Sequence, residues 1–353
     1  MTIKSKGYAT HSATAELRPF AFERRDPRPQ DIVISIAYCG ICHSDIHSAR
    51  NEWGRTSYPF VPGHEIVGRV AAVGKHVTGF KVGELAGVGC LVDSCRICFS
   101  CEAGLEQYCD NGFTGTYGGE DKIGGTPHSM TFGGYSDTIT VDQRFVLHIP
   151  ENLDLASAAP LLCAGITTYS PLKHWNVGPG LRVGVIGLGG LGHMGVKFAH
   201  AMGAHVTMIT TSPSKGADAR KLGADGVLIS KDAEAMRHAR DSFDFLLNTI
   251  PVGHDVDPYM ALLKRDATMV IVGSVEPLKR VDGIPLIFRR RSLAGSLIGG
   301  LRETQEMLDF CGQHGIVCDI ERISIKDVNK AYDRTVRGDV KYRFVIDMAT
   351  LAS

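Results

Sequence analysis

The stretch RVGVIGLGGLGHMGVKFAHAMGAHVTMIT, residues 182–210, decides how this chain folds. It opens with apolar, β-branched residues, passes through a run of glycines, continues in a helix-like pattern and ends in a second apolar run. Strand, helix and strand in about thirty residues make a βαβ unit, which implies a parallel sheet with a right-handed crossover. Four more strand candidates extend that sheet, namely GVLIS (226–230), FDFLLNT (243–249), ATMVIVG (267–273) and LAGSLIG (293–299).

The glycine run GLGGLG fits the pattern G-x-G-x-x-G. The pattern alone is weak, because a glycine-rich surface turn has the same composition, but a strand before it and a helix after it are the context of a dinucleotide site. Gly187 would allow the tight turn, Gly189 would let the backbone approach the pyrophosphate, and Gly192 would let helix and strand pack closely. The residues predicted to bind the cofactor phosphates at the helix N-terminus are Gly187, Leu188, Gly189, Gly190, Leu191 and Gly192.

The end of the second strand indicates which dinucleotide is bound. An Asp or Glu there would hydrogen-bond the ribose 2′-hydroxyl of NAD and repel the 2′-phosphate of NADP. This chain has hydroxyls and an ammonium instead, with no carboxylate before Asp218. An ordinary polar turn is the alternative, but the sequence favours NADP. The predicted phosphate contacts are Thr210, Thr211, Ser212 and Lys215.

The segments on either side of this unit differ from it in their pattern of apolar residues, glycine and proline. Residues 30–150 contain short apolar runs separated by Gly and Pro, such as DIVISIAYCG, GHEIVGRVAAVG and DTITVDQRFVLHIP, which predict an all-β region. Residues 155–172 look helical, and the tail offers two amphipathic helices, ETQEMLDFCGQHG and VNKAYDRTVRG, before a last strand, KYRFVIDM. We therefore expect an α/β protein with a catalytic domain at 1–153, a nucleotide-binding domain at 154–294 and a return to the first domain at 295–353.

Composition points to a small-molecule partner. The chain has 353 residues, 44% of them apolar, and 38 basic side chains balance 38 acidic ones, so nothing argues for binding nucleic acid or an anionic membrane. The N-terminus lacks the apolar core of a signal peptide, and no long apolar stretch occurs. We expect a cytoplasmic protein whose ten cysteines stay reduced and serve metal binding or catalysis.

Four cysteines are concentrated between residues 95 and 109. The spacing C-x-x-C-x-x-C followed by a fourth thiol matches a closed tetrahedral zinc site, which leaves no position for substrate. Independent buried cysteines and an iron–sulfur cluster are the alternatives. We predict a structural zinc site, in a lobe at about residues 90–112, with the ligands Cys95, Cys98, Cys101 and Cys109.

The decapeptide YCGICHSDIH, residues 38–47, carries a second pair of cysteines. Its C-x-x-C spacing suits half of a zinc site or a redox dithiol. GHE at residues 63–65 and Cys163 lie further along the chain. Two cysteines and a histidine with an open fourth position make a catalytic zinc set. The spacing alone leaves open which of Cys39 and Cys42 is the ligand.

Five motifs, in order, resemble the zinc-containing medium-chain dehydrogenase/reductase superfamily, and most closely its cinnamyl alcohol dehydrogenase branch of broad aldehyde reductases. They are CGICHSDIH, GHEIVG, SCRICFSC with the following YC, CAGITTYSPL and GLGGLG. The resemblance spans the chain from about residue 30 to KYRFVID. It implies a GroES-like catalytic domain beside a Rossmann domain, and two Zn²⁺ per chain.

By this resemblance the catalytic zinc ligands are Cys42, His64 and Cys163, and Glu65 can replace water on the metal. Cys39, Cys90, Cys311 and Cys318 would be buried neighbours, and the redox-dithiol interpretation loses its support. Zinc would act as a Lewis acid on the substrate oxygen and stabilise its alkoxide while hydride moves at C4 of the nicotinamide. The proton would pass through Ser44, a cofactor ribose hydroxyl and His47. Otherwise Ser44 caps a helix and His47 is a surface histidine.

The resemblance also implies contacts to cofactor and substrate. His43 would lie near the phosphates, and the residues expected around the nicotinamide and ribose are Thr167, Thr249, Gly273, Val275, Ser296, Leu297 and Ile298. Nearness to the ligand motifs suggests Trp53, Phe60, Thr114 and Tyr117, with Leu297, for a substrate pocket that favours cinnamyl, benzyl and medium-chain aliphatic aldehydes. The plant lignin enzymes of this branch usually have an aromatic residue after the last cysteine of the lobe, whereas this chain has DNGFTGTY at residues 110–117. This difference argues against dedicated monolignol chemistry.

Three other functions compete. A polyol or formaldehyde dehydrogenase of the same superfamily would keep the metal and change the pocket. A zinc-free quinone or enone reductase would lack the cysteine and histidine set, and a non-enzymatic relative would bind cofactor without turnover. The resemblance further implies a homodimer joined edge to edge through SLAGSLIGG, residues 292–300.

Overall fold

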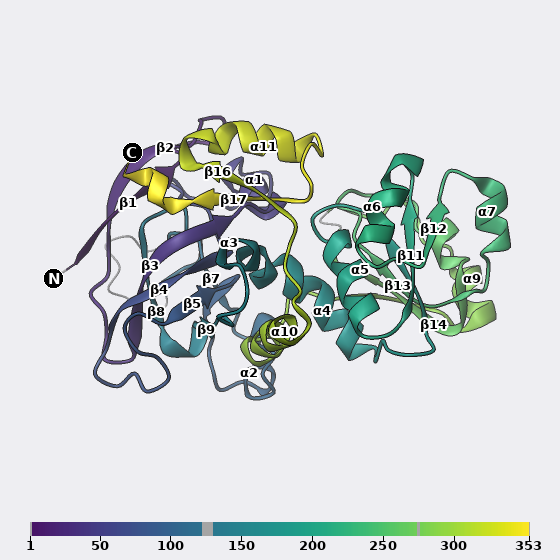
Figure 1. The fold of residues 1–353 in the computed structure, drawn as a ribbon, viewed down its shortest axis with the longest axis horizontal. Coiled ribbons are helices and arrows are strands. Elements are labelled where there is room, and N and C mark those ends of the chain that lie inside the picture. The colour runs from purple at the N-terminus through teal and green to yellow at the C-terminus, as the bar shows by residue number, and fades with distance from the viewer. Residues whose placement is uncertain (1, 122–129, 274–275, 353) are drawn as a thin grey trace. The chain divides into compact units, whose positions relative to one another are not determined.

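The computed structural model describes residues 2–121, 130–273 and 276–352. The chain divides into two compact units, one made of Met1–Cys163 with Gly299–Ser353 and the other of Ala164–Ile298 (Figure 1). The second unit is thus an insertion in the chain of the first. The first division lies ten residues and the second four residues beyond the boundaries expected from the sequence, 153/154 and 294/295.

The inserted unit is built on a six-stranded parallel sheet. Its strands are β10 (Arg182–Ile186), β11 (His205–Thr210), β12 (Gly226–Ile229), β13 (Phe243–Asn248), β14 (Leu263–Ile271) and β15 (Ser292–Gly295). Its helices are α4 (Ala164–His174), α5 (Gly192–Ala201), α6 (Gly216–Lys221), α7 (Ala233–His238), α8 (Asp257–Met260) and α9 (Gly283–Arg289), with a 3₁₀ turn, η4, at Pro213–Lys215.

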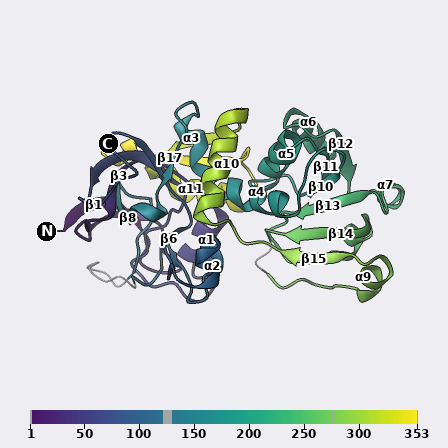
Figure 2. The same ribbon diagram turned by 90° about the horizontal axis from the view of Figure 1, so that it is seen from below.

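The strand order in this sheet is β12-β11-β10-β13-β14-β15, and every pairing is parallel. Figure 2 shows β13, β14 and β15 in that succession. Counted from β10 as the first strand, the order is 3-2-1-4-5-6, which is that of the doubly wound dinucleotide-binding fold. The order reverses between β10 and β13, and the glycine run follows β10. The predicted α/β class with a Rossmann sheet is confirmed.

The other unit is rich in strands. They are β1 (Ile3–Ala9), β2 (Arg18–Arg24), β3 (Asp31–Gly40), β4 (Ile66–Val73), β5 (Leu85–Val88), β6 (Leu91–Asp93), β7 (Thr114–Gly115), β8 (Thr138–Asp142), β9 (Leu147–His148), β16 (Ile320–Ser324) and β17 (Arg343–Asp347). They pair antiparallel except for β16 and β17, a parallel pair. Its helices are α1 (His43–Ala49), α2 (Phe99–Glu102), α3 (Leu155–Ala158), α10 (Leu301–His314) and α11 (Val328–Val336). Short 3₁₀ turns are η1 (Glu106–Tyr108), η2 (Gln143–Phe145), η3 (Ala159–Leu162), η5 (Ile325–Asp327) and η6 (Met348–Leu351).

Strand β3 organises this unit. It pairs with β4, β8 and β17, so the main sheet joins the N-terminal region to the C-terminal tail in the order β16-β17-β3-β4-β5-β9. Most residues of β3 are buried, because its apolar side chains are covered on both faces. Two small hairpins, β1 with β2 and β6 with β7, complete the unit.

Two sequence predictions need correction. Residues 155–172 do not form one helix, because the backbone leaves the helical region at Cys163 (φ −131°, ψ −68°) between η3 and α4. The last strand of the parallel sheet ends at Gly295 and does not extend through 293–299 as expected. Ile298 has φ +34°, a value that no strand adopts. In the described ranges no helix combines the length and the apolar character needed to cross a membrane.

Candidate metal centres and cofactor loop

Cys42 is positioned by the end of β3. Cys39 still lies in the strand, paired with Ile66 of β4 and Ile346 of β17, and the chain leaves the sheet after Gly40. Cys42 then becomes the N-cap of α1. Its thiol therefore stands at a strand-to-helix turn, where a side chain is held by the backbone on both sides.

Cys42 meets three residues from distant parts of the chain. His64 and Glu65 immediately precede β4, and Cys163 occupies the break between η3 and α4. One ligand atom from each of the four residues lies within 4.8 Å of the others, and the two thiol sulfurs are 3.9 Å apart. Two thiols, an imidazole and a carboxylate at these separations suit a single zinc ion.

Asp45 is a buried carboxylate that holds two of these ligands in place. It accepts hydrogen bonds from the Cys42 backbone N–H (2.7 Å), the Gly63 N–H (3.0 Å) and His64 Nδ1 (3.0 Å). A carboxylate on Nδ1 fixes the tautomer that presents Nε2 to a metal. Asp45 is not among the functional residues predicted from the sequence. Its position three residues after the N-cap, as in a capping box, is the local signal that could have identified it.

Glu65 is fully buried and forms an ion pair with Arg343 of β17. Burial raises the pKa of the Glu65 carboxyl to about 7, and the Arg343 guanidinium opposes that rise. The other carboxylate oxygen, Oε2, has no hydrogen-bond partner among the described residues. Gly40 makes room for it, because a Cβ there would lie 1.9 Å from Oε2. No local pattern reveals Arg343, since almost 280 residues separate it from Glu65.

The two thiols of this cluster differ in acidity. The contact with Cys163, together with His64 and Arg343 nearby, lowers the pKa of Cys42 well below its usual range. The same contact raises the pKa of Cys163 well above its usual range. A divalent cation bound between these sulfurs would replace the thiol protons, because metals bind the thiolate form.

The remaining cysteines belong to neither ligand cluster, although Cys90 contacts the Cys163 thiol. Cys39 is buried, and its sulfur lies against the backbone of Gly63 and Gly134 outside the cluster, in agreement with the expected role of a neighbour. Cys311 and Cys318 are also buried, as expected. Cys90 is a correction, because it is only half-buried, with its sulfur 3.8 Å from the Leu162 carbonyl oxygen.

The predicted relay residues lie on α1. Ser44 Oγ is 3.7 Å from the Cys42 sulfur, and the cap of the helix is Cys42, so Ser44 is not the capping residue. His47 is half-buried, with Nδ1 in contact with the Glu52 carboxylate and its ring stacked near Trp53. Ser44 and His47 share no direct hydrogen bond in the described chain. His43, at the start of the same helix, is exposed.

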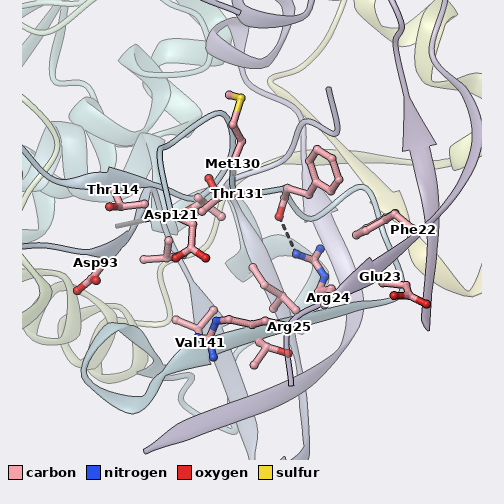
Figure 3. A pocket seen from close by; sticks show the side chains of 15 residues that line it. Phe22, Glu23, Arg24, Arg25, Asp93, Thr114, Asp121, Met130, Thr131 and Val141 are labelled. Atoms are coloured by element: carbon pink, nitrogen blue, oxygen red, sulfur yellow. Dashed lines mark hydrogen bonds between the residues drawn. The ribbon is translucent and has the colours of Figure 1, made fainter. Parts of the chain in front are cut away.

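The aromatic candidates for the substrate pocket are found in different places. The Tyr117 ring packs edge-on against both His64 (5.3 Å between centroids) and Phe60 (5.1 Å). Trp53 contacts His47 and Arg55. Thr114 lines a separate cavity, shown in Figure 3, and does not contact the metal ligands.

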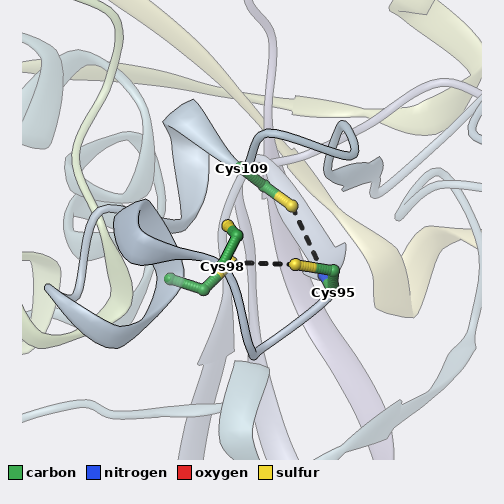
Figure 4. A group of neighbouring side chains, drawn as sticks. Cys95, Cys98 and Cys109 are labelled. Carbon is green, nitrogen blue, oxygen red and sulfur yellow. Dashed lines mark hydrogen bonds between the residues drawn. The ribbon is translucent and has the colours of Figure 1, made fainter.

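The lobe cysteines form the second cluster. Cys95, Cys98, Cys101 and Cys109 have sulfurs within 4.8 Å of one another. Figure 4 shows the Cys95, Cys98 and Cys109 side chains converging on one point. Backbone N–H groups of Cys95 and Asp110 point at the sulfurs of Cys109 and Cys98, each at 3.4 Å. Four neighbouring thiols, two of which receive these backbone hydrogen bonds, make a suitable structural zinc site.

The glycine run has the geometry that a pyrophosphate requires. Gly187 has φ +93°, which glycine adopts without strain, and a Cβ on Gly192 would lie 1.8 Å from the Gly187 carbonyl oxygen. Apart from its chain neighbours, no described residue has an atom within 4 Å of the Cβ position of Gly189, so the approach to the loop is open there. The buried Thr249 hydroxyl donates to the carbonyls of Ile186 and Gly187 at 2.8 and 2.9 Å, which fixes the start of the loop.

The turn after β11 carries the polar side chains expected there. Thr210 ends the strand and is buried, whereas Thr211 and Lys215 are exposed and Ser212 is half-buried. The Lys215 ammonium donates to the Leu188 carbonyl at 3.0 Å, so the turn reaches the glycine run. The first carboxylate, Asp218, lies on α6.

The other expected cofactor contacts are scattered. Thr167 is buried on α4, Gly273 follows β14, and Val275 lies outside the described residues. Ser296 and Leu297 follow the end of β15, and 46% of Leu297 is exposed, whereas Ile298 is buried. Their roles stay predictions.

Known proteins match along nearly the whole chain. A family model described as the alcohol dehydrogenase GroES-like domain matches residues 28–151, and one described as zinc-binding dehydrogenase matches residues 190–313. Aldehyde reductase YahK of Escherichia coli (strain K12) is 56% identical over 353 residues, which cover 99% of each chain. The structure of a cinnamyl alcohol dehydrogenase of Sorghum bicolor, SbCAD4, has a TM-score of 0.94 and 45% identity over 98% of each chain. That of CAD from Helicobacter pylori, complexed with NADP(H), has a TM-score of 0.91 and 42% identity over 99% of each chain.

Proposed function

The chain belongs to the zinc-binding dehydrogenases with an alcohol dehydrogenase GroES-like domain and is an oxidoreductase, and from this we propose that it is a broad-specificity, NADPH-dependent aldehyde reductase. Alcohol oxidation is the reverse reaction. The observation that carries the proposal is the convergence of Cys42, His64 and Cys163 beside a buried carboxylate oxygen that has no partner. A zinc ion held there supplies Lewis-acid polarisation of the substrate oxygen.

The protein's own groups orient this centre. The thiols of Cys42 and Cys163 and Nε2 of His64 would hold the ion, and Asp45 keeps the imidazole in the required tautomer. Arg343 holds one oxygen of Glu65 by charge, which leaves the second oxygen near the ligands. We assign Glu65 the role of replacing the water molecule at the fourth coordination position of the metal.

Proton delivery is assigned to α1. In aldehyde reduction the substrate oxygen gains a proton, and the Ser44 hydroxyl is the donor nearest the cysteine ligand. His47 would resupply Ser44 by way of a cofactor ribose hydroxyl. Because the Glu52 carboxylate occupies Nδ1 of His47, Nε2 is the nitrogen that exchanges its proton.

The proposed cofactor is NADP, bound on the glycine run, with its 2′-phosphate at the turn after β11. The absence of a carboxylate before Asp218 and the ammonium of Lys215 support this choice, as does the NADP(H) bound by the relative from Helicobacter pylori. Thr210→Asp should move the preference from NADPH toward NADH by roughly tenfold or more, because a carboxylate repels the phosphate. An unaltered ratio of kcat/KM values would reject this phosphate site.

One experiment tests the proposal as a whole. The zinc content of the purified protein is measured, and NADPH oxidation is then followed with cinnamaldehyde, benzaldehyde, hexanal, formaldehyde and a sugar aldehyde. Two zinc ions per chain and turnover of the aromatic and aliphatic aldehydes are expected. Turnover of formaldehyde or the sugar alone would favour the alternative dehydrogenases. NADPH binding without turnover of any aldehyde would identify a non-enzymatic binder.

A homodimer through β15 is also proposed. This strand pairs only with β14 among the described strands, so one edge of the parallel sheet is open. The adjacent α9 leaves three large apolar residues exposed, namely Ile284 (62% exposed), Ile287 (78%) and Phe288 (80%). Ile287→Glu should yield monomers in sedimentation, and Val82→Glu, at an exposed apolar position of the other unit, should not. Equal behaviour of the two variants would reject this interface.

We further propose that the protein acts in the cytoplasm on small molecules. Both cysteine clusters require thiols that stay reduced, and all ten cysteines are free. Fractionation of cells that produce the protein tests the location.

A further inference from the structure

The loop between β13 and α8, residues 249–256, begins against the glycine run of the inserted unit. A Cβ on Gly187 would lie 3.1 Å from the Thr249 hydroxyl oxygen and 3.6 Å from a side-chain carbon of Ile250. A Cβ on Gly273 would lie 2.6 Å from the Thr249 carbonyl oxygen and 3.0 Å from that of Ile250. Thr249 and Ile250 thus lie between the turns that follow β10 and β14, beside the point where the strand order reverses and where open α/β sheets bind their ligands.

Asn248, the last residue of β13, carries a fully buried amide directly before this loop. A buried amide costs free energy unless its donors and its acceptor are hydrogen-bonded. Its Oδ1 accepts from the Ile250 N–H at 3.2 Å, and its Nδ2 lies 2.9 Å from Nε2 of His254. The sulfur of Met269, 3.9 Å from Nδ2, is only a weak acceptor. The half-buried His254 is therefore the principal partner of this amide nitrogen.

Two contacts determine which nitrogen of the neutral His254 ring carries the proton. Nδ1 lies 2.8 Å from the Val252 carbonyl oxygen, and because a carbonyl only accepts, Nδ1 is the donor. Nε2 therefore accepts from the Asn248 amide. The opposite orientation of that amide would set its NH₂ group against the Ile250 N–H, donor against donor. His254 thus bridges the end of β13 to its own loop through two directed hydrogen bonds.

We propose that His254 is a positioning residue for the bound dinucleotide. The bridge to Asn248 closes residues 248–254 into a ring and holds Thr249 and Ile250 in the conformation that borders the glycine run. A loop without the bridge samples other conformations, and the apparent affinity for a ligand falls with the fraction of molecules in the competent one. This inference rests on the proposed binding of NADP(H) at the glycine run.

The test is calorimetric titration of the zinc-loaded protein with NADPH and, separately, with NADH. His254→Phe keeps a ring but neither nitrogen, and it should weaken the binding of both dinucleotides about three- to tenfold, the effect of losing one or two hydrogen bonds. Because β10 separates β13 from β11, the ratio of the two affinities should not change, in contrast to Thr210→Asp. In turnover the KM for NADPH should rise, while kcat at saturating NADPH stays within about twofold.

Two amide variants separate the contacts of the two ring nitrogens. His254→Gln places an amide oxygen near the position of Nε2, where it accepts from Asn248, and should restore the affinity for NADPH to within about twofold. His254→Asn has a shorter side chain that reaches only the position of Nδ1, beside the Val252 carbonyl, and should bind NADPH as weakly as His254→Phe does. Equal affinities of the glutamine and asparagine variants would contradict a role for the bridge to Asn248.

Further variants provide the controls, all compared well below their melting temperatures so that unfolding does not contribute. His205→Phe changes an exposed histidine at the start of β11, on the sheet edge opposite the glycine run, and should bind both dinucleotides as the unaltered protein does. Asn248→Leu, which keeps the side-chain size, should weaken binding no further when combined with His254→Phe, since both remove one bridge. Unchanged affinities of His254→Phe would overturn the proposal. An unaltered protein that bound neither dinucleotide would instead reject the proposed cofactor itself.

Discussion

The two cysteine clusters contain four potential ligands each, at the same mutual separation, yet the chain builds them in opposite ways. The lobe cluster lies within residues 95–109, on one turn-rich segment. The catalytic cluster joins Cys42, His64, Glu65 and Cys163, brought together by β3, β4 and the break before α4. Four thiols that are close together in the chain can fix the conformation of a loop when they bind a metal. Residues around ligands that the tertiary fold brings together can instead alter the acidity and orientation of those ligands.

The surroundings of the clusters differ accordingly. Backbone N–H groups contact two of the lobe thiols, and Ser94 Oγ lies 3.3 Å from the Cys101 sulfur. The residues of the proposed catalytic cluster are instead flanked by buried charges, Asp45 and Arg343. A charged neighbour alters ligand basicity and orientation more strongly than a neutral one does, because hydrogen bonds to ionised groups are about twice as strong. The substitutions below test whether one cluster is a metal site adjusted by charged neighbours and the other a metal site that only stabilises the lobe.

Removing a catalytic ligand should have the largest effect. Cys163→Ala is expected to lower kcat/KM at least about 1000-fold, because Lewis-acid stabilisation contributes several kcal/mol to the transition state. The melting temperature and NADPH binding should change little. Steady-state kinetics and calorimetry check both. Activity close to that of the unaltered protein would show that Cys163 is not a ligand.

Removing a lobe ligand should act on stability instead. Cys98→Ser is expected to lose about one zinc ion per chain and to lower the melting temperature by at least about 5 °C, because structural zinc contributes folding free energy. Elemental analysis and thermal unfolding measure the two effects. Protein that remains folded at low temperature should retain turnover. An unaltered melting curve despite the lost ion would show that this zinc does not stabilise the fold.

Breaking the buried ion pair should cost less than losing the ligand but more than changing a neutral neighbour. Arg343→Met leaves the Glu65 carboxylate unpaired, and the free energy of unfolding should fall by about 3 kcal/mol. Arg343→Met combined with Glu65→Gln should recover much of that loss, since no buried charge remains. A double variant as unstable as the single one would show that the packing of Arg343, rather than its charge, matters.

Asp45→Asn tests the tuning of His64. The amide keeps the size of the side chain but removes the charge on Nδ1, so zinc affinity at the catalytic site or turnover should fall about 10- to 100-fold. Competition with a chelator measures the affinity. The lobe zinc should be retained. Equal loss of both ions would mean that Asp45 supports the fold in general.

The same contrast explains which parts of this structure could be predicted from the sequence. The lobe cluster and the glycine run are readable because all their parts are neighbours in the chain. The choice of Cys42 over Cys39 is not, since spacing permits both. Its physical cause is that Cys39 lies within β3, paired on both sides, whereas Cys42 lies beyond the end of the strand.

Other features depend on long-range contacts that no local pattern encodes. Arg343 reaches Glu65 only because β17 pairs with β3. The pairing of β1 with β2 was not predicted, because Gly7 and Pro19 lie within these segments and glycine and proline are uncommon inside strands. The helix expected over 155–172 breaks at Cys163, where ligand geometry overrides helix propensity.

Ser94→Ala should have the smallest effect and gives the matched partner to Asp45→Asn. It deletes one neutral hydroxyl near the Cys101 sulfur while the backbone contacts to Cys98 and Cys109 remain. We expect a loss of about 1 kcal/mol or less in the free energy of unfolding and no change in turnover. Chemical denaturation and the same chelator competition measure it. If Ser94→Ala released the lobe zinc as readily as Asp45→Asn weakens the catalytic site, neutral and charged neighbours would be equivalent, and the contrast between the clusters would lie only in their ligands.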